Sequence, residues 1–535
     1  MSYTKEEKEV LQQYFTNTDK DIFVLTNLPE VIKGTLFSRY SRTAKDLRRL
    51  FLDEFYLAKD LKGMFGKKND NEKALDVARA EDFYERILVG YGDDSVAELG
   101  GAHIALENIS VLATKSIEEH RIGLSPLEKS TRYVYYDRKM NGEYMFYKDE
   151  KLMRSRYRKA YMKVVNNLFD TYSKIVREIQ PLLMKLFPGD ADEKAYKFSI
   201  RAKACDIARG LLPLSTKTNM GVYGNGRSIE YILLHMLNDP LVEVRDAAVM
   251  MNKELSKIIG ALIKRATSER GEKYRKYLQK TERDLLRHTK VDKKKLGEAK
   301  GLTVKLVSHD TKSVEKVIAS IIYERTNIPY IRAYEKAVKM STREKEKIIR
   351  ETSIHRENRH QKPGRFLESP YFGFEITADW GVYKDLMRHR ILTRHRQLFT
   401  SELGYWVPNE VDFAGFGKIY RSAMDEASVL FLKMKRQFPH ESQYIVTHGS
   451  YNRFYFLMNL REAIHLSELR SSPQGHPTYR KVAQEVAKRI AEKFPLFGKC
   501  LLPFVDYKDY ELERLSAFRK LEAKAKKYGV KGFEE

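Results

Sequence analysis

The segment RHRILTRHRQ, at residues 388–397, carries four arginines and two histidines within ten positions. It follows YFGFEITADWGVY, at residues 371–383, whose early alternation of apolar and polar side chains predicts a strand that leads into a helix. A guanidinium stays protonated and offers a planar fork that matches phosphate. Two arginines that flank an imidazole are therefore suited to hold a phosphorylated ligand beside a titratable ring. A solvated basic helix face or a nucleic-acid-binding stripe would have the same composition.

A weaker copy of this segment occurs earlier, as EHRIGLSPLEKSTRY at residues 119–133. It begins with a similar Glu/Arg-His-Arg-Ile and ends in Arg-Tyr, where the later copy ends in Gly404-Tyr405. A second matching pair is NGRSIEYI at residues 225–232 and NLREAIHL at residues 459–466, and each is expected to open a long helix after an aromatic-rich strand. Internal similarity of this kind indicates a repeated unit. The chain is therefore predicted to contain two diverged copies of one unit, residues 1–290 and 300–535.

The hydrophobic periodicity predicts many helices and few strands. The expected helices span residues 5–16, 98–119, 151–187, 195–212, 311–325, 461–469 and 478–494. The expected strands include residues 302–308, 374–376 and 454–458. The sequence GYGDDSVAE, at residues 90–98, has the pattern of a helix-capping turn. Long helices with a few strands of antiparallel length predict a helix-rich α+β fold, in which each unit has a small, mostly antiparallel sheet.

Composition narrows the classes of function. The excess of 98 Lys and Arg over 73 Asp and Glu gives a net charge of +25, which favours anionic partners such as nucleotides, a folate tail or nucleic acid. The two cysteines, Cys205 and Cys500, cannot form a disulfide framework, and neither lies at metal-ligand spacing from another Cys or His, so no metal site is expected. No apolar run is long enough to cross a bilayer and the first residues lack a signal-peptide pattern, so a soluble cytoplasmic protein is expected.

The motifs, in their order and spacing, resemble those of the flavin-dependent (alternative) thymidylate synthases. That family has an Arg-His-Arg segment that leads to Ser-x-Arg-Tyr, preceded by a Gly-His-x-[ST]-x-x-Glu turn. Ala-Arg-x-x-Leu-Pro-Leu and Asn-x-Arg-x-x-x-[NH]-x-x-x-Leu-Arg follow it. The chain resembles a tandem fusion of two such units. The resemblance implies methyl transfer to dUMP, with 5,10-methylenetetrahydrofolate as carbon donor, reduced FAD as hydride donor and NADPH as the reductant of the flavin. Such chemistry requires no protein nucleophile, and the sequence has no Gly-rich loop of a separate NAD domain.

The family motifs are divided between the two halves. By resemblance, the first half keeps the residues that hold the nucleotide phosphate and sugar, which are Ser130, Arg132 and Arg209. The second half keeps the flavin-binding set and an arginine for the nucleotide, which are Arg388, His389, Arg390, Asn459, Arg461, His465 and Arg470, and Glu128 of the first half is assigned to the flavin as well. Arg388, His389 and Arg209 are the residues expected to act in catalysis.

Each half has lost the set that the other keeps. The second half has Ser401 to Tyr405 in place of Ser-x-Arg-Tyr, and Gln443 in place of the arginine before Leu-Pro. The first half has Glu119 for the leading arginine and His235-Met236 for Leu-Arg. Because the family builds each site between subunits, this division predicts one composite site per chain. The histidine of the family's turn is also missing. The first half has Asp93 at its position but keeps Ser95 and Glu98 of the pattern. The matching turn of the second half is KPGRFLE, at residues 362–368, which keeps only Glu368.

Two fused units amount to half of the family's tetramer, so a homodimer that completes a four-unit pseudo-tetramer is expected. A second function class stays open, in which a degenerate family member binds nucleic acid or serves a structural role. Aromatic and basic side chains interleave at residues 132–138 and 451–455, as they do in nucleic-acid-binding proteins, although no recognised nucleic-acid-binding motif is present.

Overall fold

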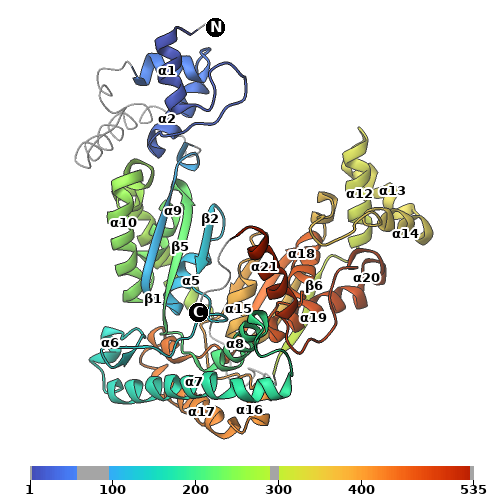
Figure 1. Cartoon of the computed structure of the whole chain (residues 1–535). Coiled ribbons are helices and arrows are strands. Elements are labelled where there is room, and N and C mark those ends of the chain that lie inside the picture. Colours follow the sequence, from blue (N-terminus) through green and yellow to red (C-terminus); the bar gives the residue numbers. More distant parts are fainter. Residues whose placement is uncertain (1–2, 57–95, 290–300, 530–535) are drawn as a thin grey trace. The chain divides into compact units, whose positions relative to one another are not determined.

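The computed structural model describes residues 3–56, 96–289 and 301–529 (Figure 1). The chain forms two compact units, which do not coincide with the two sequence halves. The first unit contains residues 1–128 and 218–293, and the second contains residues 129–217 and 294–535. Residues 129–217 of the first half therefore pack with the second half. The sequence boundaries at residues 290 and 300 remain a prediction about the repeat.

The first unit is built on a three-stranded sheet with the order β1 (Gly101–Ser110), β5 (Lys217–Asn225) and β2 (Leu124–Glu128). Strands β2 and β5 are antiparallel. Helix α10 (Val242–Ile263) packs on β1 and on α9 (Gly226–Met236). Its other helical segments are α1 (Lys5–Tyr14), α2 (Glu30–Tyr40), α3 (Leu47–Phe51), the π-helical η1 (Leu52–Tyr56), η2 (Val96–Glu98), α5 (Val111–Glu118), η4 (Lys264–Ala266) and α11 (Glu269–Leu286).

The prediction of one helix over residues 98–119 is wrong. The sequence GAHIALENIS forms strand β1, and helix α5 begins only after Ser110, whose side chain caps the Ala113 amide at 3.0 Å. Ala, Leu and Glu favour a helix locally, but pairing with β5 overrides that preference. The chain therefore enters the Glu119 segment from a strand and a short helix.

The second unit contains a four-stranded sheet with the order β6 (Thr303–His309), β7 (Tyr371–Asp379), β9 (Tyr451–Asn459) and β8 (Leu392–Arg396). All of its pairings are antiparallel, and β7 aligns with β9 from Tyr371 opposite Asn459 to Asp379 opposite Tyr451. A two-stranded hairpin joins β3 (Lys139–Met140) to β4 (Glu143–Tyr144). Phe372, Phe374 and Phe456 are fully buried in the core on this sheet.

Helices make up most of the second unit. The long α7 (Arg158–Leu186) packs against α8 (Lys194–Ala208) and α17 (Gly417–Met434), and α18 (Leu460–Arg470) packs against α19 (Pro477–Lys493). The other helical segments are α6 (Glu150–Met153), η3 (Arg209–Leu211), α12 (Ser313–Arg325), α13 (Tyr330–Lys339), α14 (Thr342–Glu351), η6 (Arg365–Glu368), α15 (Trp380–Leu386), α16 (Asn409–Phe413), η7 (Glu441–Ile445), α20 (Pro495–Leu501) and α21 (Leu515–Lys527). The predicted helix at residues 151–187 is thus α6 followed by α7, and the one at 195–212 ends as α8 and the 3-10 turn η3.

The two sheets share one topology, which confirms the tandem repeat and the helix-rich α+β fold. The order β1-β5-β2 of the first unit matches β7-β9-β8 of the second. In each copy a short helix follows the first strand, capped by Ser110 or by Asp379, and a longer helix follows the central strand, capped by Asn225 or by Asn459. Each cap supplies a side-chain oxygen to an orphan amide of the first helical turn.

Two corresponding segments of the halves meet inside the second unit. Residues 209–216 lie beside residues 443–450, and their main chains exchange reciprocal hydrogen bonds. The Leu214 amide donates to the Val446 carbonyl at 2.8 Å, and the His448 amide donates to the Leu212 carbonyl at 2.9 Å. The Ser215 amide likewise donates to the Tyr444 carbonyl at 3.0 Å, and the Gly449 amide donates to the Gly210 carbonyl at 2.8 Å. This local pseudo-two-fold seam carries Arg209 next to elements of the second half. In the described part of the chain, no helix is long and apolar enough to cross a membrane.

Candidate functional site

Arginines from both sequence halves surround Asp385 in the second unit. Arg209 Nη1 lies 3.4 Å from Asp385 Oδ2. Burial raises the pKa of Asp385, but the positive charges of Arg209, Arg132, Arg388 and Arg470 outweigh this effect and hold the pKa at about 2. Four of the predicted site residues thus act electrostatically on one carboxylate, which is ionised at neutral pH, and Arg209 contacts it directly.

Arg209 reaches this place because helix α8 ends in the 3-10 turn η3, with which the seam begins. Its side chain is almost completely buried, and its Nη2 atom has no hydrogen-bond partner among the described residues. Gly381, in the first turn of α15, makes room for it, since a Cβ atom there would lie 2.6 Å from Arg209 Nη2. A buried donor without a partner is rare in folded proteins and is suited to meet a ligand.

Asp379 is the second carboxylate beside Arg209. It caps α15, accepting a hydrogen bond of 3.2 Å from the Val382 amide. Burial raises its pKa to about 6, although the nearby Arg209 charge and hydrogen bonds from Thr478 and Val382 act in the opposite direction. Two carboxylates with well-separated pKa values therefore flank one guanidinium.

Arg132 is held by contacts to both halves. Its Nε and Nη2 atoms donate to the two oxygens of Asp206 at 2.8 and 2.9 Å, and its Nη1 atom donates to the Tyr479 hydroxyl at 3.1 Å. The Ser130 hydroxyl accepts a hydrogen bond of 3.2 Å from the Arg132 amide, which fixes the turn that precedes it. The Tyr479 ring lies within 6 Å of both the Arg132 and Arg470 guanidiniums. The aromatic ring therefore links the arginine of one half to that of the other.

His389 is a neutral link between Arg470 and Glu462. Burial and the Arg470 charge hold its pKa well below 6.5. Arg470 Nε lies 3.0 Å from His389 Nε2, and His389 Nδ1 lies 2.5 Å from Glu462 Oε1. Because Arg470 can only donate, Nε2 must be the acceptor and the ring proton lies on Nδ1, which donates to Glu462. This chain of hydrogen bonds fixes both the tautomer of His389 and the direction of Arg470.

A cavity of about 180 Å³ lies at the start of α18. It is lined by Arg359, Lys362, Pro363, Glu368, Ile391, Asn459, Arg461, Glu462, His465 and Glu468. Arg461 donates to the Pro363 carbonyl at 2.8 Å and pairs with Glu368 at 2.9 Å. The corresponding pair of the first half, Arg227 and Glu98, is 2.7 Å apart.

The charges of this cavity favour an anion. Its carboxylates are engaged, since Glu368 pairs with Arg461, Glu462 receives His389, and Glu468 pairs with Arg356 at 2.6 Å. Burial lowers the pKa of the lining His465 to about 4, so this ring is neutral at physiological pH. Glu462 keeps its negative charge, because its partner His389 is neutral, so the cations Arg356, Arg359, Lys362 and Arg461 exceed the three carboxylates by one positive charge. These residues fit the anionic part of a dinucleotide.

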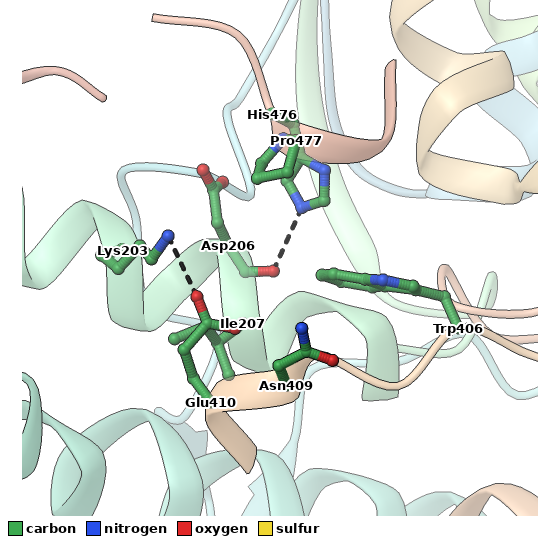
Figure 2. Close-up of a pocket in the computed structure, with 8 residues that line it drawn as sticks. All are labelled: Lys203, Asp206, Ile207, Trp406, Asn409, Glu410, His476 and Pro477. Atoms are coloured by element: carbon green, nitrogen blue, oxygen red, sulfur yellow. Dashed lines mark hydrogen bonds and ion pairs between the residues drawn. The ribbon is translucent and has the colours of Figure 1, made fainter. Parts of the chain in front are cut away.

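A second cavity, of about 190 Å³, adjoins Asp206 (Figure 2). It is lined by Lys203, Asp206, Ile207, Trp406, Asn409, Glu410, His476 and Pro477. Lys203 Nζ lies 3.0 Å from Glu410, and His476 Nε2 lies 3.3 Å from the Asp206 carbonyl oxygen. The indole of Trp406 forms one wall, edge-to-face with the His476 ring.

Three of the predicted site residues differ in the compact unit that holds them and in their exposure. Glu128 belongs to the first unit, where it is buried 3.2 Å from Lys115 Nζ. Arg390 is exposed, whereas Arg388 is partly buried. The capping turn predicted at residues 90–98, with its Asp93 and Ser95, lies outside the described residues except for its last three positions, which form η2.

Where one half lacks an arginine of the family, the residue in its place has a structural role. Gln443 is buried, its Oε1 atom accepts from the Phe399 amide at 2.9 Å, and its Nε2 atom donates to the His440 carbonyl at 3.1 Å. Gly404, where the first half has Arg132, adopts a φ of 77°, which a glycine accommodates without strain. Met236 is buried in the core of the first unit. A glutamine with both amide atoms engaged is not available to a ligand.

Sequence reasoning missed the carboxylates and the tyrosine that organise the arginines, namely Asp206, Asp385, Glu462 and Tyr479. The available signal was their spacing. Asp206 and Asp385 each precede a predicted arginine by three residues, and Glu462 follows Asn459 by three, so each lies one helical turn from a motif residue.

Burial raises the pKa of Cys205 to about 12, so this thiol is protonated at neutral pH and is no nucleophile.

The family model described as thymidylate synthase complementing protein matches residues 48–259 and again residues 305–496. A UPF0159 protein of Chlamydia muridarum (strain MoPn / Nigg) is 40% identical over 519 residues, covering 96% of this chain and 97% of the relative. The UPF0159 protein Ta1429 of Thermoplasma acidophilum is 33% identical over 512 residues, covering 91% of this chain and 97% of the relative. Among solved structures, a UMP/dUMP methylase PolB from Streptomyces cacaoi bound with 5-Br dUMP matches with a TM-score of 0.31 and 17% identity. That match covers 39% of this chain and 98% of that chain, and so low a score carries no weight of its own.

Proposed function

Because this chain belongs to the thymidylate synthase complementing protein family, we propose that it methylates dUMP on the uracil ring. One observation carries the proposal. Arg132 and Arg209, from the first half, and Arg388 and Arg470, from the second, all act on Asp385 within a single compact unit. A phosphate dianion and a uracil that gathers negative charge are ligands that such a cluster favours.

In the proposed complex, Ser130, Arg132 and Arg209 hold the nucleotide phosphate and sugar, and Arg470 binds a uracil oxygen. The unpaired Nη2 atom of Arg209 supports this assignment, since a nucleotide oxygen would supply the acceptor that the protein does not. Arg470 is oriented by His389, which is neutral and accepts a hydrogen bond from Arg470 Nε. Arginines held in this way stabilise negative charge on the uracil without reorganising during the reaction.

The flavin is assigned to the cavity at the start of α18. Asn459, Arg461 and His465 line it, and Arg388, His389 and Arg390 belong to the neighbouring segment. The net positive charge of this cavity suits the diphosphate of FAD. When bound, the flavin would supply the hydride, with 5,10-methylenetetrahydrofolate as carbon donor and NADPH as reductant. The protein would orient the ligands and exclude water, and the protonated Cys205 leaves the reaction without a protein nucleophile.

Flavin binding is tested by colour. The purified protein is expected to have an oxidised-flavin absorption spectrum, and Arg388→Ala with Arg390→Ala is expected to give a folded but colourless protein. Losing a charge-assisted contact costs about 1.5–3 kcal/mol, so losing two empties the site during purification. Arg325→Ala with Arg332→Ala, at two exposed arginines on α12 and α13, is the matched control and should stay yellow. A yellow Arg388/Arg390 variant would contradict the assignment.

Activity is tested with dUMP that carries tritium at the position to be methylated. Release of tritium into water should require methylenetetrahydrofolate and NADPH, and it should fall at least tenfold in Arg209→Ala. Tritium release that is independent of the folate, or none at all with flavin bound, would overturn methylation as the function.

The nucleic-acid alternative predicts exposed aromatic rings along residues 132–138. Tyr133 is 47% exposed, but Tyr136 is buried, and the Tyr135 ring lies within 4.4 Å of the guanidiniums of both Arg177 and Arg201. These contacts leave Tyr135 poorly placed to stack on a base. A colourless protein that binds RNA with a steep dependence on salt would nevertheless favour the alternative.

We expect the enzyme to act in the cytoplasm as a homodimer.

A further inference from the structure

The C-terminal segment at residues 506–527 lies beyond residue 496, where the family match ends, yet it is fastened to the elements of the proposed nucleotide site. The Asp506 amide donates to the Ser471 hydroxyl at 2.9 Å, directly after α18. Glu513 lies 2.7 Å from Lys203 on α8, and Arg519 donates twice to Glu193 at 2.6 and 2.8 Å. The segment is therefore attached at its first residue, at Glu513 and within α21 (Leu515–Lys527).

Between these attachments the segment directs Arg514 to Asp206. Arg514 Nη2 donates to Asp206 Oδ2, the oxygen that also accepts from Arg132 Nη2. The Arg514 guanidinium lies 5.1 Å from the centre of the Tyr133 ring, next in sequence to Arg132. Its side chain is only 3% exposed, and its Nε atom has no hydrogen-bond partner among the described residues.

The sharing of one carboxylate changes the charge at the site. Arg132 and Asp206 alone would form a neutral, mutually satisfied pair, with little attraction left for an anion. With Arg514 the group at Asp206 has two guanidiniums and one carboxylate, so it has an excess of one positive charge. The neighbouring Lys203, Glu410 and Glu513 have the opposite excess but pair among themselves, so the attraction for a ligand phosphate is local to Arg132 and Arg514.

Taking the proposed nucleotide site as its premise, we propose that Arg514 is a positioning residue that makes this site selective for a doubly charged phosphate. Arg514 acts through Asp206, sharing it with Arg132 so that the Arg132 guanidinium keeps its attraction for the ligand. The ligand class is a nucleoside monophosphate whose phosphate is a dianion, in preference to a phosphodiester with a single charge.

The test compares dUMP with its methyl phosphodiester, which has the same base and sugar but one negative charge less. Dissociation constants of both ligands are measured by calorimetry on the full-length protein and on Arg514→Gln and Arg514→Lys. Glutamine keeps a hydrogen bond to Asp206 without the charge, whereas lysine keeps the charge without the planar fork. The wild type should prefer dUMP at least tenfold, Arg514→Gln should lose most of this preference, and Arg514→Lys should retain it in part.

Arg519→Ala is the matched control, because it loosens the same segment without touching Asp206, and its ligand preference should equal that of the wild type. Equal weakening of both ligands in Arg514→Gln, or no change in either, would overturn the inference while leaving the proposed function intact. A loss of preference in Arg519→Ala as large as in Arg514→Gln would also overturn it, since attachment of the segment and not the Arg514 charge would then be responsible. If the wild type binds neither ligand, the proposed function falls and this inference falls with it.

Discussion

The arginines of the site differ in how many of their N–H donors have a hydrogen-bond acceptor within the protein. Arg132 has acceptors on Asp206 and Tyr479, so the folded chain alone fixes its position. Arg209 has one contact of 3.4 Å and an unpaired Nη2 atom in the interior. Leaving a buried donor without an acceptor typically costs about 1–3 kcal/mol. Nucleotide binding would remove that penalty, which makes Arg209 the residue at which ligand and fold are most directly coupled.

Replacing Arg209 or Arg470 by Ala is therefore expected to weaken dUMP binding by roughly 1.5–3 kcal/mol each, or about tenfold to 150-fold. The double variant should lose less than the sum, because both residues serve one ligand and share Asp385. Calorimetric titration measures all three. Gln443→Met and Met236→Leu, at the corresponding positions of the other half, should leave the dissociation constant unchanged. Strictly additive losses would indicate that the two arginines do not act on the same molecule.

Asp379 is expected to give the stability of the protein a distinctive pH dependence. Its pKa is about 6 in the folded chain and 3.8 in the reference state, so the native state holds the proton more tightly. Its contribution to stability is therefore present below pH 4 and is lost as the pH rises through 6, by about 3 kcal/mol in total. The side chain introduced by Asp379→Asn cannot titrate but can still cap α15. The free energy of unfolding of this variant should therefore increase relative to that of the wild type between pH 4 and pH 7. Denaturant titrations across this range measure the difference.

Asp310→Asn provides a comparison of opposite sign. The hydrogen bond from Lys316, among other causes, lowers the pKa of Asp310 despite the opposing effect of burial. This carboxylate therefore stabilises the fold above its reference pKa, and its removal should be more harmful at neutral than at acid pH. A constant difference between Asp379→Asn and the wild type from pH 4 to pH 7 would refute the assignment of a raised pKa.

At the scale of elements, short helix α15 controls the site through a residue without a side chain. Because a Cβ atom at Gly381 would lie 2.6 Å from Arg209 Nη2 and 2.9 Å from Asp379 Oδ1, Gly381→Ala should displace the guanidinium. We expect dUMP affinity to fall about tenfold or more, comparable with the loss of a charged contact, while far-ultraviolet circular dichroism stays unchanged. Gly221→Ala, where a Cβ would meet nothing within 4 Å, is the control. Unaltered affinity in Gly381→Ala would mean that Arg209 does not bind the nucleotide from this position.

The elements also mark the limit of what sequence could predict. The strand expected at residues 374–376 corresponds to β7, which extends three residues farther at each end, and the helix expected at 478–494 corresponds to α19 within one residue. The helix expected at residues 98–119 was wrong, because most of this segment forms β1, and β1 pairs with β5, whose residues lie more than a hundred positions away in the sequence. Asp206 and Asp385 were missed for a similar reason, since a carboxylate acquires its role only when arginines from distant segments converge on it.

At the scale of the whole molecule, sequence similarity located the repeat but not the way in which its parts associate. The matching segments at 225–232 and 459–466 do begin corresponding helices. The compact units nevertheless divide the first half, and residues 129–217 pack with the second half. That exchange includes the seam between residues 209–216 and 443–450, whose hydrogen bonds are made by the main chain and so leave no side-chain signature.

The same seam has one arginine and one glutamine at its equivalent positions, and this asymmetry yields a prediction for the assembled protein. Arg209 has an unpaired donor, whereas both amide atoms of Gln443 are used within the protein. A chain with one competent site should bind one dUMP per 62.6 kDa, and light scattering should report a homodimer with two nucleotides bound in total. Gln443→Arg should not create a second site, because the arginine set of the first half is also incomplete, with Met236 and Glu119 in place of arginines. Two nucleotides per chain, or a monomer that binds dUMP with full affinity, would show that the halves do not pool their residues in the proposed way.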